Sequence, residues 1–378
     1  MQSGEDRLSN KNTLETRTAG EYRRDRFGLH SRIRRLLIAR VMETQPGVHA
    51  GNVHRTAACT WVRVEDVVSL VRPVSRTTYH YKGLVTCGSV WACPLCASKI
   101  QERRRQEVAR AIAHAGTIAR APFMVSITFP HRVDQPLSLL LELQRQALAK
   151  MRAHRDYKAL MVKAATAGRI RALEVTHGQN GWHPHTHELL LLDPKVPAQW
   201  LREELAPMWL KACRAVGLFK PDRDREEDFL RHSVDVQAGD EGVADYLAKL
   251  DDQHAWGLSH ELSKSSSKQG RRTGAHPFQL ATEKGRAALF VEYVEAMKGQ
   301  RQLVWSRGLK AAVGIEELSD EEIAKQETER ADDQIPVQMS AWRYVLGNDA
   351  RWELTHAAQV GGTPEVERLL RLLGWKPS

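Results

Sequence analysis

The sequence lacks the features that mark several broad classes of protein. It has no apolar stretch approaching about 18 residues and no signal-peptide pattern at Met1–Arg7, so we expect a soluble, cytoplasmic protein with no membrane partner. It has no internal repeat and no Gly-rich phosphate-binding loop, which argues against an ATPase or a helicase. Its few cysteines would stay reduced in the cytoplasm, so they are available to bind a metal.

The charge balance indicates a polyanionic partner. The 378 residues include 56 Lys and Arg against 46 Asp and Glu, a formal net charge of +10. Residues 31–40 and 98–112 are predicted to form helices with basic faces. Such a face is usually only solvated, but together with the overall positive charge it favours contact with phosphates. The predicted DNA-contacting side chains are Lys99, Arg103, Arg104, Arg105, Arg171 and Lys310.

Three histidines alternate along one predicted strand. His183, His185 and His187 precede the apolar run Leu189–Leu192, and alternate side chains of a strand point to the same face. Neutral imidazole is the commonest metal ligand in proteins, so this face predicts a metal site. A chance or solvated His-rich tract is the alternative, and the strongly apolar strand argues against it.

A carboxylate is expected beside these histidines. Residues 170–176 form another predicted strand that contains Glu174, and the polar turn 177–181 would join the two strands as a hairpin. Glu174 would then supply an oxygen ligand. A set of two histidines and a carboxylate suits Mg²⁺ or Mn²⁺ at a phosphate, and it equally suits zinc that activates water.

A candidate nucleophile lies further along the chain. Tyr246 and Lys249 are three residues apart in the predicted helix 242–250, so they share one face of that helix. A phenol is a weak nucleophile until a cation or a metal favours the phenolate, and Lys249 and the metal could both do so. The spacing alone is a weak pattern, because a half-buried tyrosine beside a solvated lysine would produce it too.

The cysteines predict a second metal site. Cys93 and Cys96 form a CxxC pair and Cys87 precedes it, which gives three thiolates with the spacing of a tetrahedral zinc site. Cys59 or His54 would complete the site. A redox-active CxxC pair is the rival interpretation, but no thioredoxin-like pattern surrounds this pair.

The order of these motifs resembles that of HUH endonucleases, and specifically of the rolling-circle plasmid replication initiator (Rep) proteins. The order is the apolar strand 123–130, then the segments 171–176 and 183–187, then Tyr246-Leu247-Ala248-Lys249. The stretches 87–96, 292–299 and 305–310 also look like the same family. The resemblance spans roughly residues 55 to 325, and the ordered set is far more specific than any single motif.

The resemblance implies a role for each of these residues. His185 and His187 would be paired ligands of a catalytic Mg²⁺ or Mn²⁺, Glu174 the third ligand, and His183 a ligand or a residue that orients the others. Tyr246 would attack a phosphodiester at the plasmid origin, leaving a 5′-phosphotyrosine link and a free 3′-hydroxyl that primes synthesis. Lys249 would steady the scissile phosphate or the phenolate.

The sequence departs from the family at one position. Many relatives place a glutamate four residues before the tyrosine, where it activates water for the terminating cleavage, and this chain has Gly242 there. Glu241 and Asp245 are the nearest carboxylates, but neither shares the helix face of Tyr246 as a residue four positions earlier would. The sequence therefore does not decide whether Glu241 or Asp245 is the base that activates water.

The fold implied by the resemblance is α+β, with an antiparallel central sheet flanked by helices in an HUH, ferredoxin-like nuclease core. Strands are expected near residues 123–129, 170–176, 186–192 and 232–238, and helices with N-terminal caps are predicted at Ser319 and Thr363. The expected division is a flexible arm (1–28), a basic-helix, zinc-knuckle and DNA-binding region (29–118), a nuclease domain (119–325) and a helical tail (326–378).

Three functions stay open at this point. The first is a metal-dependent nicking and joining enzyme that acts on plasmid origin DNA in single-stranded or hairpin form, with host helicase and polymerase partners that only the family implies. The second is a relaxase or single-strand transposase of the same HUH group. The third is a non-catalytic, zinc-containing repressor, in which Tyr246 would never become linked to DNA. The sequence leaves the oligomeric state open.

Overall fold

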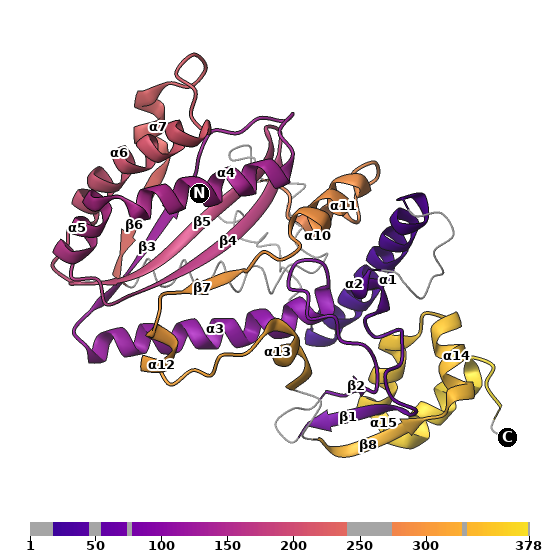
Figure 1. Ribbon diagram of the computed structural model, residues 1–378. Helices are drawn as coiled ribbons and strands as arrows, with labels where there is room; N and C mark the ends of the chain where they lie inside the picture. Colours follow the sequence, from indigo (N-terminus) through magenta and orange to yellow (C-terminus); the bar gives the residue numbers. More distant parts are fainter. Residues whose placement is uncertain (1–17, 45–53, 74–77, 240–273, 327–330, 377–378) are drawn as a thin grey trace, which may run out of the picture.

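The computed structural model describes residues 18–44, 54–73, 78–239, 274–326 and 331–376. Its larger sheet has five antiparallel strands in the order β6-β3-β5-β4-β7 (Figure 1). The strands are β3 (Ala121–Ile127), β4 (Gly168–Gly178), β5 (Gly181–Leu192), β6 (Val234–Ala238) and β7 (Leu303–Trp305). β4 and β5 form a long hairpin, so the predicted hairpin and all four predicted strands are confirmed.

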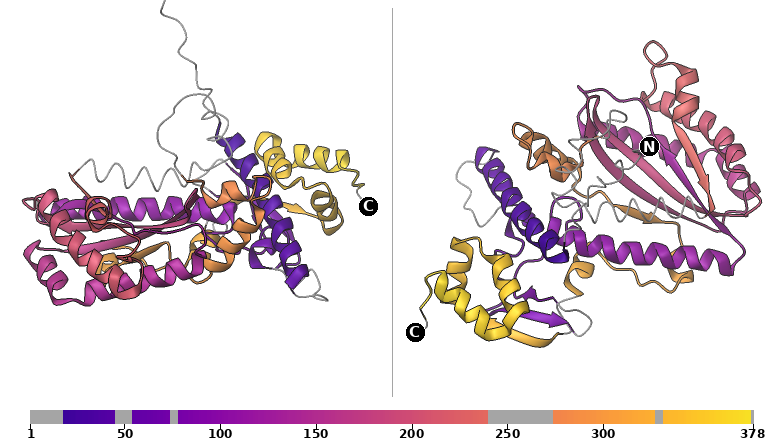
Figure 2. Two further views of the ribbon diagram at one scale, coloured as in Figure 1. Left: turned by 90° about the horizontal axis from the view of Figure 1, so that it is seen from above. Right: turned by 180° about the vertical axis from the view of Figure 1, so that it is seen from behind.

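Helices pack on both faces of this sheet (Figures 1 and 2). Phe123, Val125 and Leu190 face a large core shared with α4, α5, α6 and α7. Met124 and Leu189, on the opposite face, pack against α3. The bounds are α3 (Pro94–Thr117), α4 (Leu137–Ala153), α5 (Arg155–Lys163), α6 (Ala198–Val216) and α7 (Glu226–His232). Apolar side chains on both faces explain why β5 ends in a continuous run of leucines.

A smaller sheet lies beyond α3, where the two ends of the described chain meet (Figure 1). Its order is β2-β1-β8, and both pairings are antiparallel. The elements here are α1 (Ala19–Thr44), α2 (Arg55–Ala58), β1 (Val68–Pro73), β2 (His80–Lys82), β8 (Ala331–Val337), α14 (Met339–Gly347) and α15 (Arg351–Leu372). Val68 and Leu70 share one core with Trp342 and Leu354, so residues 331–376 pack against residues much earlier in the chain.

The α+β class with antiparallel sheets flanked by helices is confirmed, while several helix boundaries differ from the prediction. α1 begins at Ala19, so residues 19–28, expected to be part of a flexible arm, are helical, and the predicted helix 31–40 is only its middle. α13 (Asp320–Gln326) begins as predicted, because Ser319 and Glu322 form a reciprocal capping box. α15 kinks at Gly361 and Gly362, immediately before the predicted cap Thr363.

The remaining described helices are short, and two of them precede β7 while the third follows it. They are α10 (Pro277–Leu280), α11 (Ala287–Ala296) and α12 (Leu309–Ala312). Within the described residues, no helix is both long enough and apolar enough to cross a membrane.

Arg351 joins the N-terminal helix to the C-terminal one. Its fully buried guanidinium pairs with Asp349 at 3.2 Å and donates hydrogen bonds to Ser31 at 2.6 Å and Thr60 at 2.7 Å. It also contacts Nδ1 of His30 at 3.2 Å. Burial, with a contribution from the Arg351 charge, lowers the pKa of His30 to about 3, so the ring stays neutral and accepts this hydrogen bond.

Replacing Arg351 with methionine is expected to lower the free energy of unfolding by about 2–4 kcal/mol, because buried acceptors on α1 lose their donor. Chemical denaturation followed by circular dichroism measures this change. Arg343 is exposed on neighbouring α14 and provides the control, and Arg343→Met should cost less than about 0.5 kcal/mol. Equal losses in the two variants would show that Arg351 does not hold the helices together.

Candidate metal centres

The β4–β5 hairpin brings the three histidines and Glu174 onto one face of the sheet. Glu174 lies directly opposite His185 in the register, and Ala172 lies opposite His187. Directly opposed residues of an antiparallel pair point to the same side. His183, His185 and His187 therefore share a face with Glu174, as the sequence predicted.

The face that carries the histidines is polar near the start of β5 and apolar near its end. Further toward the end of β5, Leu189 and Leu191 on the same face are covered by α3. The opposite face is covered by α4, where buried Glu188 pairs with Arg152. Arg171, a predicted DNA contact, lies directly opposite Glu188 in the register, so it is on the face away from the histidines.

Both ring nitrogens of His187 have a polar partner. Its Nε2 lies 2.9 Å from a carboxylate oxygen of Glu174, and its Nδ1 lies 2.9 Å from the hydroxyl of Ser126 on β3. Two neighbouring ligands of one octahedral Mg²⁺ or Mn²⁺ are separated by about 3 Å. The Glu174–His187 separation is that of a hydrogen bond and also that of two neighbouring metal ligands. Among the described residues, Glu174, His185 and His187 do not bring three ligand atoms within 4.8 Å of one another, as the cysteines do.

His183 contacts its neighbours rather than Glu174. Its Nε2 lies 2.7 Å from the Thr128 hydroxyl and its Nδ1 lies 3.0 Å from Nε2 of His185, while the His131 ring stacks on it at 4.2 Å. Burial, then the neighbouring His185 and His131, lower the pKa of His183 to about 3. A neutral His183 can orient His185 through this contact. The contact has to break before Nε2 of His185 can bind a metal.

Sequence reasoning missed three polar residues around the histidines, namely Ser126, Thr128 and His131. Ser126 lies directly opposite His187 in the β3–β5 register. The signal was present in the sequence, because Ser126 and Thr128 alternate within an otherwise apolar strand, which places both on one face. Nothing in the sequence showed that β3 is the neighbour of β5.

The predicted nucleophile lies outside the described residues. This is true of Tyr246 and Lys249, and also of Glu241 and Asp245, the two carboxylates considered as the base for termination. Their placement beside the histidines stays a prediction from the sequence.

Four buried cysteines form a compact cluster that could hold a metal ion. The ligand atoms of Cys59, Cys87, Cys93 and Cys96 all lie within 4.8 Å of one another. The Cys59–Cys96 and Cys87–Cys96 sulfur separations are 3.6 Å, close to the roughly 3.8 Å expected for two thiolates on one tetrahedral zinc ion. Hydrogen bonds from Cys59, Cys87 and Cys93 lower the pKa of Cys96, while the hydrogen bond with Cys87 raises the pKa of Cys59 and burial raises the pKa of Cys93. The case for a metal site therefore rests on the spacing of the four sulfurs.

The four-cysteine set decides between the two predicted fourth ligands. Cys59 belongs to the cluster, whereas His54 caps α2 by accepting a hydrogen bond from the Thr56 amide at 3.2 Å. The fifth cysteine, Cys213, is buried on α6 and lies outside the cluster.

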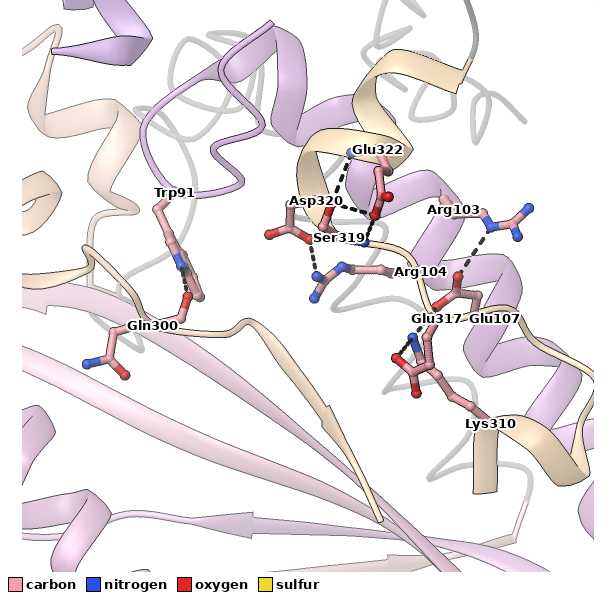
Figure 3. A network of polar contacts seen from close by, with 10 residues as sticks. All are labelled: Trp91, Arg103, Arg104, Glu107, Gln300, Lys310, Glu317, Ser319, Asp320 and Glu322. Atoms are coloured by element: carbon pink, nitrogen blue, oxygen red, sulfur yellow. Dashed lines mark hydrogen bonds and ion pairs between the residues drawn. The ribbon is translucent and has the colours of Figure 1, made fainter. Parts of the chain in front are cut away.

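Two of the predicted DNA-contacting cations converge on one buried carboxylate. Glu107 on α3 is only 4% exposed, and it pairs with Arg103 at 3.2 Å and with Lys310 at 3.8 Å (Figure 3). Lys310 also pairs with Glu317 at 3.3 Å. These contacts attach the segment around α12 to α3, so Lys310 has a structural partner in the chain itself.

The other predicted cations on α3 also have partners. Arg104 pairs with Asp320 at the start of α13, and Arg105 pairs with Glu102 at 2.9 Å (Figure 3 shows the first pair). Lys99 differs, because within the described ranges its ammonium hydrogen-bonds to the Ala324 carbonyl oxygen at 3.4 Å and forms no ion pair. Phosphates would have to displace acidic side chains from Arg103, Arg104, Arg105 and Lys310, whereas no acidic side chain of the described residues pairs with Lys99, whose charge acts on the nearby Cys96 thiol.

Aromatic residues of the stretches 87–96 and 292–299 connect the cysteine cluster to the hairpin. Trp91 donates a hydrogen bond to the Gln300 carbonyl at 2.9 Å (Figure 3) and packs edge-on against Tyr293 of α11. Tyr293 in turn stacks against Trp182 at the start of β5, with ring centroids 6.1 Å apart. An aromatic contact therefore links residues next to Cys93 with the strand that carries the histidines.

Comparisons with known proteins agree with the motifs. The family model described as replication protein matches residues 84–350. A protein named Protein rep from Streptomyces lividans is 27% identical over 299 residues, which cover 62% of this chain and 65% of that protein. A Neomycin resistance protein from Streptomyces cyanogenus is 29% identical over 146 residues, 31% of this chain and 32% of that protein. The chain thus spans less than two thirds of the length of these curated relatives. No solved structure matches.

The cysteine cluster predicts a measurable zinc content. Purified protein is expected to contain about one tightly bound zinc ion per chain, and Cys93→Ser should remove it and lower the thermal midpoint, because the site contributes to folding. Elemental analysis by mass spectrometry measures the zinc. Cys213→Ser removes a buried thiol outside the cluster and should keep the zinc. Zinc content that survives Cys93→Ser would rule out the four-cysteine site.

Proposed function

The chain belongs to the family of replication proteins, and on this premise we propose that it initiates rolling-circle replication of a plasmid by nicking one strand of the origin. The observation that carries the proposal is the contact of His187 with Glu174, on the same face of one hairpin as His185. This contact supports two of the ligands that a divalent ion at a phosphate would need. The origin DNA would be single-stranded or in hairpin form at the site of cleavage.

The metal in this proposal is Mg²⁺ or Mn²⁺, held by Glu174, His185 and His187. When bound, the ion would polarise a non-bridging oxygen of the scissile phosphate. Ser126 orients His187 through Nδ1, the nitrogen that faces away from Glu174. His183 contacts Nε2 of His185, so this contact would have to break before that atom binds the ion. The hairpin is a rigid support for such a set, because both strands have neighbours in the sheet.

Tyr246 is the proposed nucleophile. Its phenolate oxygen would form a bond to phosphorus while the bond from phosphorus to the 3′-oxygen breaks, and the departing oxygen takes up a proton to become the 3′-hydroxyl. The protein would stay linked to the 5′-phosphate. Lys249 would favour the phenolate or steady the phosphate, and Glu241 or Asp245 would activate water to end the cycle.

Host proteins enter this proposal only through the family. A polymerase would extend the 3′-hydroxyl and a helicase would separate the strands ahead of it. The excess of 56 Lys and Arg over 46 Asp and Glu supports contact with DNA in general.

The nucleophile is tested by trapping the covalent product. Incubation with single-stranded origin oligonucleotides and Mn²⁺, followed by denaturing electrophoresis, should yield a slowly migrating adduct. Tyr246→Phe should abolish it, because the ring without its oxygen cannot attack phosphorus. Tyr157, a buried tyrosine on α5, provides a matched control, and Tyr157→Phe should still form the adduct.

Cleavage that persists in the Tyr246→Phe variant would mean that another residue is the nucleophile. Tight binding of the oligonucleotide by the unmodified protein, with no adduct under any divalent ion, would favour the repressor function instead.

The proposed metal ligands are tested by measuring the affinity for Mn²⁺, without a cleavage assay. Glu174→Gln removes the only carboxylate in the proposed ligand set, so the affinity for Mn²⁺ should fall by more than about tenfold. Titration of zinc-loaded protein with Mn²⁺, with free Mn²⁺ followed by electron paramagnetic resonance, measures this affinity. Glu142→Gln changes an exposed carboxylate on α4 and should leave it unchanged. Equal affinities in the two variants would exclude Glu174 as a ligand.

A further inference from the structure

A pocket lies away from the histidines, between α1, β2 and the first turns of α3. Its volume is about 270 Å³. The wall includes Arg23 and Arg26 from α1, Lys99 and Ser98 from α3, and the loop residue Thr86. Cys59 and Cys96 of the cysteine cluster also line it. The cluster therefore helps to shape the pocket.

The pocket has an excess of positive charge. Arg23, Arg26 and Lys99 line it, together with His80, against one acidic residue, Glu102. Glu102 is already bonded to Arg105 through both carboxylate oxygens, at 2.9 and 3.0 Å. Both oxygens of this acid are thus already bonded to an arginine that does not line the pocket.

Arg26 is the most informative of these residues. Its half-buried guanidinium forms no hydrogen bond and no ion pair with any residue that the structure describes. Burial lowers the pKa of Arg26, an effect that the charge of the adjacent Asp25 offsets only in part. A desolvated cation without a partner destabilises a fold, so a position of this kind is typical of a site that binds an anion.

Lys99 supports the same interpretation. It lies in the same wall, and among the described residues its ammonium hydrogen-bonds to the neutral Ala324 carbonyl and pairs with no acid, unlike the arginines further along α3. The hydroxyl of Thr86 adds a hydrogen-bond donor beside these two cations, whereas the Ser98 hydroxyl already donates to the Leu95 carbonyl at 3.1 Å. Cations combined with hydroxyls match the oxygens of a phosphate.

We propose that the pocket between α1, β2 and α3 binds a backbone phosphate of DNA through Arg26 and Lys99, as an anchor separate from the nicking site. The choice of DNA as the source of the phosphate rests on the proposed function. Lys99 lies near the N-terminus of α3, whereas the C-terminal half of that helix packs on the sheet, about 20 Å further along (Figure 1). α3 therefore connects the pocket with the sheet face that carries the histidines further along β5.

The test compares DNA binding by three variants of the zinc-loaded full chain. Fluorescence anisotropy with a labelled duplex of arbitrary sequence, at several salt concentrations, gives the affinity and its salt dependence. Arg26→Gln should weaken binding by about tenfold at low salt and reduce the log–log salt slope by about 0.9, the value for one lost phosphate contact. Arg26→Lys should restore most of the slope.

The control is Arg155→Gln, which removes one exposed charge from α5. If Arg26→Gln and Arg155→Gln have equal affinities and slopes, the proposal is wrong. If Arg26→Gln fails to fold, Lys99→Gln replaces it in the same comparison.

Thermal unfolding in the presence of inorganic phosphate or a mononucleotide tests whether the pocket binds a free phosphate instead of a DNA phosphate. Protection of the unmodified protein but not of Arg26→Gln, with unchanged duplex binding, would assign the pocket to a free phosphate and overturn the DNA assignment.

The two proposals fail separately. Arg26→Gln should still form the covalent adduct with a short single-stranded oligonucleotide, because Arg26 is not part of the nicking site. An unmodified protein that forms no adduct would contradict the nicking function, while the salt slope would still decide whether the pocket binds DNA.

Discussion

The candidate active site depends on the register of the β4–β5 hairpin. Because side chains alternate along a strand, a shift of one residue in β5 would move all three histidines to the face that packs against α4. In the observed register Glu174 lies opposite His185. The leucines that follow the histidines stabilise this register. Leu189 and Leu191 fill the space under α3, while Leu190 and Leu192 belong to the core on the other face. The hydrophobic effect thus selects the register that also aligns the polar site.

α3 connects the two parts of the molecule that the proposals involve. Its N-terminal turn carries Cys96 and lines the charged pocket, and its C-terminal half covers the sheet. Buried Glu107 between these regions holds Arg103 and Lys310, so the segment that follows β7 is attached to the same helix. Since Trp91 and Tyr293 link the cysteine cluster to the start of β5, metal binding at the cysteines would steady the hairpin from a distance.

The positive charge of the chain is used in two different ways. Most cations of α3 are paired with acids that stand next to them in the helix or come from the segment 317–320, and such pairs attach neighbouring segments to each other. Arg26 and Lys99 form no ion pair within the described part of the chain. A count of charges cannot separate the two groups, because Arg104 pairs with Asp320 and Lys310 with Glu107, each far away in the sequence.

The sequence by itself determined the local features of this protein. Alternation placed His183, His185 and His187 on one face, the turn 177–181 implied the hairpin with Glu174, and the spacing of Cys87, Cys93 and Cys96 predicted a tetrahedral site. These depend on residues close together in the chain, where strand geometry limits the outcome. Only the tertiary structure decided that Cys59 joins the cluster instead of His54, that β3 brings Ser126 to His187, and that Arg171 points away from the histidines. Those outcomes depend on which distant segments pack together, and burial of apolar surface across the whole chain, rather than any local pattern, selects that packing.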